Sequence, residues 1–208
     1  MKTEISLQSD FQNVDKEMTR SKLVSTPGLW INGKICWLQN GYEKILPEYS
    51  VSVHVKSVQK HSKVQYNEIY VRNHSKENIE VKVLLLSHFS KSDPNHLAFV
   101  SPTDNVIFHS VEDQLMLVNG EFNGTSLEQR TVQPIWNVHT DLIWKNQENG
   151  SLKYLPMGKG GYVSICSLHM KLAPQTSNVG RTWTIYGNNK EVIMDLNHIL
   201  LKNSTSIS

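Results

Sequence analysis

Cysteine is scarce in this 208-residue chain, and long apolar runs are missing. The two cysteines, Cys36 and Cys166, lie far apart and form no C-x-x-C pair, which argues against a structural zinc site. We expect both thiols to be reduced and buried in strands. A disulfide between them is the alternative, and it would require an oxidising compartment.

An excess of one charge is also absent: 21 basic and 19 acidic residues leave a formal net charge of +2. Balanced charge without a basic cluster predicts no nucleic-acid partner. The N-terminus lacks the apolar stretch of a secretory signal, and the longest aliphatic run, residues 83–86, is too short to span a bilayer. We therefore expect a soluble, cytoplasmic protein with no transmembrane segment.

Common catalytic motifs are missing as well. The chain contains no G-x-S-x-G elbow, no H-E-x-x-H helix and no G-x-x-x-x-G-K-[ST] phosphate loop. These absences favour a non-enzymatic role and predict neither a cofactor nor a metal ion.

Alternation of apolar and polar residues is the strongest positive signal. It runs through residues 49–56 and again through 79–86, and residues 64–72 between them are rich in Val, Ile and Tyr. A period of two is typical of strands that place one face on a core. With a polar turn at residues 73–78, the whole stretch predicts a β-meander.

Asn-Gly pairs indicate tight reversals, because both central residues of a type I′ turn need positive φ. Five pairs occur, at residues 32–33, 40–41, 119–120, 123–124 and 149–150. Strands are further predicted near residues 29–38, 97–100, 106–109, 114–118, 131–144, 162–172 and 181–186. So many reversals favour an antiparallel sheet.

One α-helix is predicted, at residues 189–202. Asn188 and Glu191 have the spacing of a capping box. An apolar stripe follows: Val192, Ile193, Leu196, Ile199 and Leu200. Such a stripe must be covered, and we expect the helix to close one end or edge of the sheet.

These signals predict an all-β fold, an antiparallel β-sandwich-like domain over residues 29–202 with the C-terminal α-helix. Residues 1–28 form a polar N-terminal arm, either flexible or a short helix, and residues 203–208 form a tail. A boundary near residues 121–130, dividing the chain into two small β subdomains, is the alternative.

The segment from 136 to 144 supplies the candidate catalytic residues. If it is a strand, His139 and Asp141 share one face, with Cα atoms about 6.5 to 7 Å apart. An imidazole beside a carboxylate can act as a general base or offer two ligands to a metal. A solvent-facing strand surface is the simpler interpretation.

Aromatic and glycine-rich stretches supply the candidate ligand-binding residues. Trp136 and Trp144 alternate onto the other face of the same segment, and Lys159 lies within the glycine-rich residues 157–161. Exposed tryptophans would form a platform for sugars or peptides, whereas core packing is their usual role. Residues 157–161 precede a strand, so a hairpin loop is favoured over a phosphate site. A flexible lip beside a binding face, with Lys159 at its tip, is a further alternative.

Residues 132–144, together with Leu-Pro-Met-Gly-Lys at 155–159, resemble uncharacterised conserved proteins of Gram-positive spore formers. The resemblance covers about a quarter of the chain. It implies a bacterial cytoplasm, cell envelope or spore as the location, and it implies no catalytic or binding residue.

Three functions follow as hypotheses. The first is a non-enzymatic binding or scaffolding module for a protein or a cell-envelope polymer. The second is a hydrolase or lyase that uses His139 and Asp141. The third is a structural component of a virion or spore. The sequence leaves the ligand and the oligomeric state open.

Overall fold

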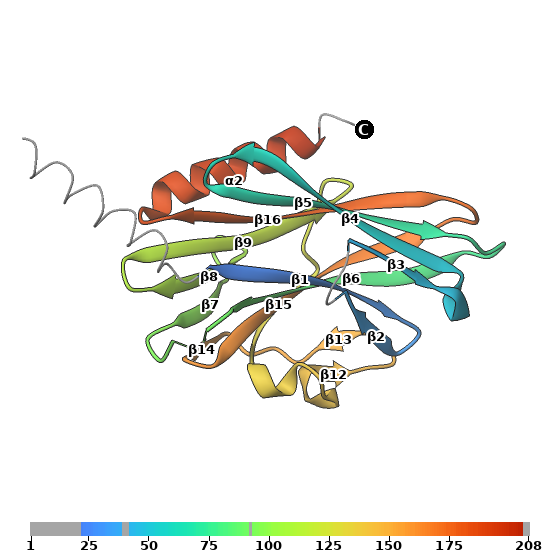
Figure 1. Ribbon diagram of the computed structural model, residues 1–208, viewed down its shortest axis with the longest axis horizontal. Coiled ribbons are helices and arrows are strands. Elements are labelled where there is room, and N and C mark those ends of the chain that lie inside the picture. The colour runs from blue at the N-terminus through green and yellow to red at the C-terminus, as the bar shows by residue number, and fades with distance from the viewer. Residues whose placement is uncertain (1–21, 39–41, 92, 206–208) are drawn as a thin grey trace, which may run out of the picture.

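The computed structural model describes residues 22–38, 42–91 and 93–205. They form two stacked antiparallel sheets, with one helix on an outer face (Figure 1). The predicted all-β sandwich with a C-terminal helix is thus confirmed. Most of the N-terminal arm, including its candidate short helix, lies outside the described residues, as does the Asn-Gly pair at 40–41.

The five-stranded sheet has the strand order β11-β15-β6-β1-β2. Its strands are β1 (Leu23–Ile31), β2 (Lys34–Trp37), β6 (Ile79–Phe89), β11 (Gln129–Pro134) and β15 (Tyr162–Leu172). Strand β1 begins inside the segment that the sequence assigned to the arm, and it pairs with β6 from Leu23 onward.

The larger sheet has the order β14-β7-β8-β9-β16-β5-β4-β3, with β10 paired to β9. Its strands are β3 (Glu43–Leu46), β4 (Val51–His61), β5 (Val64–Asn73), β7 (Leu97–Ser101), β8 (Val106–Val111), β9 (Gln114–Phe122), β10 (Thr125–Ser126), β14 (Met157–Lys159) and β16 (Ser177–Gly187). Strands from both sides of residues 121–130 share each sheet, so both parts of the chain build the same core.

Short elements complete the chain: η1 (Pro47–Tyr49), η2 (Ile135–Asn137), η3 (Asp141–Ile143), the small hairpin β12 (Trp144–Asn146) with β13 (Ser151–Leu152), and helix α2 (Lys190–Thr205). Tyr49 therefore lies in a 3-10 turn and not in the strand that its alternation indicated. Among the described residues, no helix has the length and apolarity needed to cross a membrane.

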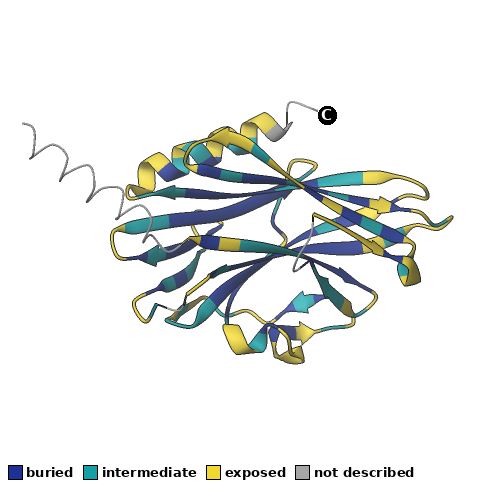
Figure 2. Cartoon of the chain, in the orientation of Figure 1, coloured by how far each residue is buried: buried dark blue, intermediate teal, exposed yellow. Residues whose placement is uncertain are grey.

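Buried apolar side chains form three clusters, one between the sheets and one on each outer face. Figure 2 shows that buried residues occupy the strands of both sheets. Val51, Val53 and Val55 point between the sheets, as their alternation predicted. Trp30 and Trp183 lie on the outer faces of the two sheets. Trp30 packs beneath η3 and the β12–β13 hairpin, and Trp183 packs beneath α2. Because both faces of β6 are covered, its middle is buried without interruption.

Two Asn-Gly pairs form the predicted type I′ turns. Residues 32–33 have φ of 48° and 76°, and residues 123–124 have φ of 49° and 74°. The pair at 119–120 is an error of the prediction, since it lies within β9. Gly120 is needed there because a Cβ would lie 2.7 Å from the carbonyl oxygen of Arg181 on the neighbouring strand.

Helix α2 differs from its prediction in cap and position. The side-chain oxygen of Asn189, and not Asn188, accepts from the backbone N–H groups of Glu191 and Val192, at 2.8 and 3.3 Å. The helix lies across the outer face of the larger sheet instead of an edge (Figure 1).

The buried face of α2 contains a polar residue that the apolar stripe did not include. Asn197 is buried between Ile193 and the partly buried Leu200, whereas Val192 and Ile199 are about half exposed. The Asn197 side-chain oxygen accepts from the indole N–H of Trp183 at 3.0 Å. A polar contact therefore fixes the register of the helix on the sheet.

Candidate functional site

The chain leaves the sheet at Pro134, so the predicted strand from 136 to 144 does not form. Backbone N–H groups of Val138 and Thr140 instead donate three residues back, to the carbonyl oxygens of Ile135 and Asn137. Thr140 also caps η3. These local hydrogen bonds satisfy the backbone without a neighbouring strand, which overrides the alternation.

This change removes the basis of the proposed catalytic pair. His139 and Asp141 lie on exposed turns and do not share a strand face. The two tryptophans of the segment also separate: Trp144 packs into the outer core, whereas Trp136 is 67% exposed.

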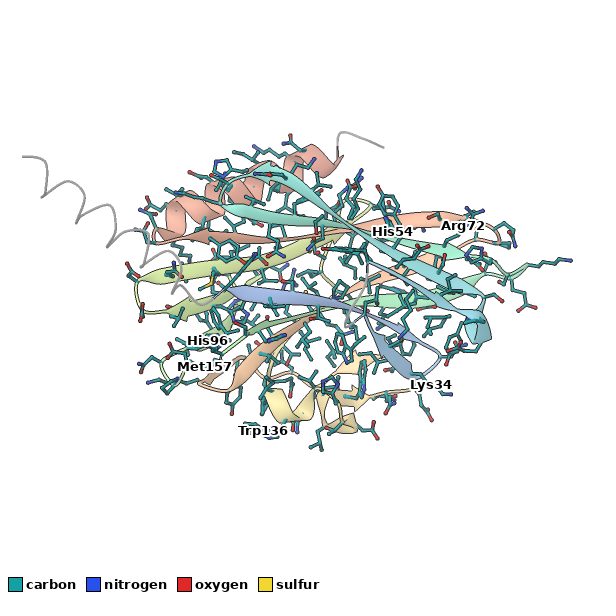
Figure 3. The ribbon with its side chains drawn as sticks, viewed as in Figure 1. Lys34, His54, Arg72, His96, Trp136 and Met157 are labelled. Atoms are coloured by element: carbon teal, nitrogen blue, oxygen red, sulfur yellow. The ribbon has the colours of Figure 1, made fainter. Side chains whose placement is uncertain are left out.

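The ring of Trp136 rests beside the glycine-rich segment. Its centroid is 6.4 Å from that of Tyr162, with the planes inclined by 64°. Tyr162 in turn lies directly on the backbone of Gly158, where a Cβ would be 2.0 Å from the tyrosine ring. Figure 3 labels Trp136 on this part of the surface. We call Trp136 and Tyr162 the aromatic pair.

The glycine-rich segment is not the predicted hairpin loop. Met157–Lys159 forms β14, which pairs with β7 in the larger sheet. Gly160, with φ of +82°, then turns the chain into β15 of the smaller sheet. Lys159 is exposed on β14 opposite Leu97 and does not line the cleft described next.

A cleft of about 110 Å³ opens where this turn meets the loop before β7. Its polar rim consists of His88, Lys91 and Asp93, and Ile135 adds an apolar wall. The full lining is His88, Phe89, Ser90, Lys91, Asp93, His96, Ile135, Gly160, Gly161, Tyr162 and Val163. Tyr162 of the aromatic pair therefore lines a small cleft with charges of both signs, and Trp136 lies next to Tyr162.

Behind the cleft, a chain of hydrogen bonds crosses from one sheet to the other. His96 Nδ1 lies 3.1 Å from the carbonyl oxygen of Gly160, His96 Nε2 lies 2.9 Å from His109 Nδ1, and His109 Nε2 lies 2.7 Å from Ser164 Oγ. A carbonyl oxygen only accepts, so the hydrogen of His96 is on Nδ1. It follows that His109 donates from Nδ1 and that Ser164 donates to His109.

Burial keeps both imidazoles neutral. Desolvation lowers the pKa of His96, against the opposing effect of its hydrogen bond to Gly160. Desolvation, with the charges of His96 and His88 adding to it, lowers the pKa of His109 to about 3. Ser164 is 1% exposed, so this chain positions the wall of the cleft and does not present a nucleophile to solvent.

Sequence reasoning did not single out these histidines. A signal existed for His109, which falls in the same phase of β8 as the buried Ile107 and Val111. No local pattern could have joined it to Ser164, which is 55 residues away in sequence. Within residues 22–38, 42–91 and 93–205, no three His, Cys, Asp or Glu side chains are grouped to hold a metal ion.

No family model matches this sequence, and neither does any curated protein. Among solved structures, the chain is similar to a bacterial glucoamylase complexed with acarbose, at 8% identity and a TM-score of 0.49, over 86% of this chain and 28% of that one. It is also similar to a polysaccharide lyase, at 10% identity and a TM-score of 0.44, over 82% of this chain and 26% of that one. The chain thus spans about a quarter of the length of either protein, and the likeness is limited to β-rich architecture.

Proposed function

We propose that this protein is a non-enzymatic binding module for a carbohydrate polymer, with the aromatic pair and the adjoining cleft as its contact surface. The exposed ring of Trp136 carries the proposal. Large aromatic side chains gain free energy by leaving water, and the two-thirds exposed indole of Trp136 offers a large apolar surface to a ligand.

The chemistry of the surface fits a sugar. One face of a pyranose ring is made of C–H groups that pack on an aromatic ring, while its hydroxyl groups need donors and acceptors. His88, Lys91 and Asp93 supply both kinds of partner at the rim of the cleft. Because one cation and one anion lie there together, a neutral glycan is favoured over a polyanion.

The size of the cleft favours a polymer over a small free ligand. Pockets that enclose whole small molecules have volumes of about 300 to 1,000 Å³. A cleft of about 110 Å³ admits only an edge or substituent of the ligand. The remainder of a glycan would then lie across the aromatic pair.

Rigid support adds to the argument, because a ring held in place loses little entropy on binding. The backbone N–H of Ile135, next to Trp136, donates to the carbonyl oxygen of Gly161 at 3.0 Å. Tyr162 is fixed by its close approach to Gly158.

Native gel electrophoresis through soluble glycans, beginning with cell-envelope polysaccharides, tests the proposal. A ligand should retard the wild-type protein, and Trp136→Ala should weaken binding roughly thirtyfold, which corresponds to about 2 kcal/mol. Tyr42→Ala is the matched control, because Tyr42 is an aromatic residue that is 69% exposed and lines a different cleft.

Equal retardation of the two variants, or no retardation of the wild type by any glycan, would contradict the proposal. The same samples address the other hypotheses. Turnover of a glycan that disappears in His139→Ala would favour the hydrolase or lyase, and sedimentation of large ordered particles would favour a virion or spore component.

A further inference from the structure

Arg130, on the edge strand β11, has hydrogen-bonding capacity that the described residues do not use. Its Nη1 donates to the carbonyl oxygen of Leu127 at 3.0 Å. Its Nε and Nη2 atoms are buried and have no hydrogen-bond partner among the described residues. Buried donors without partners are rare, because each costs the free energy of losing its water.

The two unused donors lie on the same edge of the guanidinium group. Nη1 is on the same side of the Nε–Cζ bond as Cδ, so the N–H bonds of Nε and Nη2 point in parallel on the opposite side. This pair matches the two oxygens of a carboxylate in the bidentate arrangement that arginine prefers. The Nε and Nη2 edge of Arg130 is therefore complementary to a carboxylate group.

In the described part of the chain, Arg130 also forms no ion pair. Glu128, two residues earlier, directs its carboxylate to Lys82, with N–O distances of 3.3 and 3.4 Å. Cys166 is opposite Arg130 in register, but burial raises the pKa of its thiol to about 12, so it is neutral at physiological pH. Burial lowers the pKa of Arg130, yet a guanidinium stays charged in proteins.

An open cleft of about 410 Å³ lies at this edge of the sandwich, between β11 and the turn that joins β7 to β8. Arg130 is one of its lining residues, and Val100, Pro102, Leu152 and Tyr154 give it apolar walls. In the structure the Nε and Nη2 atoms are buried, whereas the Arg130 side chain as a whole is partly exposed. Binding in the cleft therefore requires a change of the Arg130 rotamer that turns the Nε and Nη2 edge toward it.

We propose that this cleft, hereafter the Arg130 cleft, binds a small organic carboxylate, whose two oxygens accept from Nε and Nη2 of Arg130 while its apolar body packs on Leu152 and Tyr154. The site is separate from the aromatic pair and does not depend on the proposed glycan binding.

A carboxylate suits the Arg130 cleft better than phosphate for two reasons. A single negative charge balances the single guanidinium of Arg130, whereas a dianion would leave one negative charge unbalanced and would be repelled more strongly by Glu128, which also lines the cleft. The apolar walls favour an organic acid, because an inorganic ion would leave them uncovered.

Thermal unfolding and titration calorimetry of the full chain test the proposal at constant ionic strength, with benzoate as the probe. Benzyl alcohol and phosphate are the comparison ligands, and acetate and glucuronate distinguish a bare carboxylate from one on a sugar. We expect saturable stabilisation by benzoate and none by benzyl alcohol.

Substitutions separate binding from a structural role. Arg130→Lys keeps the charge but loses the parallel donor pair, and it should weaken benzoate binding about tenfold. Arg130→Met removes a partly buried guanidinium with two unpartnered donors, so it should unfold at the same or a higher temperature than the wild type while losing the response to benzoate. Arg72→Lys, at an exposed arginine on β5, is the matched control and should leave binding unchanged.

Several results would overturn the proposal. They are the absence of any response to carboxylates, equal responses in the Arg130→Lys and wild-type proteins, a response to phosphate alone, and a lower unfolding temperature for Arg130→Met with benzoate binding retained. Trp136→Ala should leave the benzoate response intact, so a failure of the glycan proposal would be seen separately.

Discussion

The histidine chain behind the cleft should make the protein less stable in mild acid. In the unfolded chain, His109 has an ordinary pKa of about 6.5 and takes up a proton as the pH falls. In the folded protein it stays neutral, since burial lowers its pKa to about 3. The unfolded state therefore binds more protons between these two values, and stability decreases as the pH falls through this range.

The size of the effect follows from the two pKa values. Between about pH 7.5 and pH 5, the single proton taken up by unfolded His109 favours unfolding by about 2 kcal/mol. His96 contributes in the same direction, because burial lowers its pKa as well. For a domain of this size, 2 kcal/mol corresponds to a decrease of roughly 4 to 8 °C in Tm.

Urea unfolding at the two pH values measures the effect, with His109→Gln as the test variant. Glutamine keeps a polar side chain of similar size but does not titrate, so this variant should lose about 2 kcal/mol less than the wild type on acidification. His139→Gln is the control, because it makes the same substitution at an exposed position outside the histidine chain.

Comparison of the three proteins removes the contribution of carboxyl groups, which titrate in all of them. If His109→Gln lost as much stability as the wild type between the two pH values, His109 would not be held neutral by burial. The assigned hydrogen-bond directions along the histidine chain would then be wrong.

Three further predictions concern stability. Arg181→Met should lower the free energy of unfolding in urea by about 3 kcal/mol or more, because it leaves the buried carboxylate of Glu121 without the Arg181 guanidinium 2.8 Å away. Adding Glu121→Gln to this variant should recover much of that stability. Asn197→Ala should cost about 2 kcal/mol by the same assay, because the side-chain oxygen of Asn197 accepts hydrogen bonds from two buried donors. An equal loss from an alanine substitution at an exposed position of α2 would show that these hydrogen bonds are not the cause. Deletion of residues 1–27 should lower Tm relative to deletion of residues 1–21, because only the longer deletion removes part of β1; equal Tm values would contradict the pairing of that part with β6.

The candidate site was only partly predictable. Trp136 was identified as a ligand-binding candidate, and it is exposed beside Tyr162, which lines a cleft. Its proposed companions Trp144 and Lys159 are elsewhere, because the strand that would have aligned them is replaced by two 3-10 turns. Alternation identifies strands only when a neighbouring strand is available to pair with them.

The environment of the two cysteines was also only partly predictable from the sequence. Both are free, and Cys166 is buried in β15 as expected, but Cys36 is partly exposed on β2. Strand β2 forms the edge of the smaller sheet, and its position at an edge is not visible in its own sequence.

The sequence alone determined most of the long strands, the turns at residues 32–33 and 123–124, and the presence of a terminal helix, because these depend on local periodicity and on residues that tolerate positive φ. Only the tertiary structure decided which polar residues are buried and what they meet. His109 meets Ser164 across the sheets, and Arg130 keeps one edge unpaired at the margin of the sandwich. Such contacts join distant parts of the chain. Their effect on stability arises from desolvation, which occurs only when the two sheets pack together and bury the polar groups.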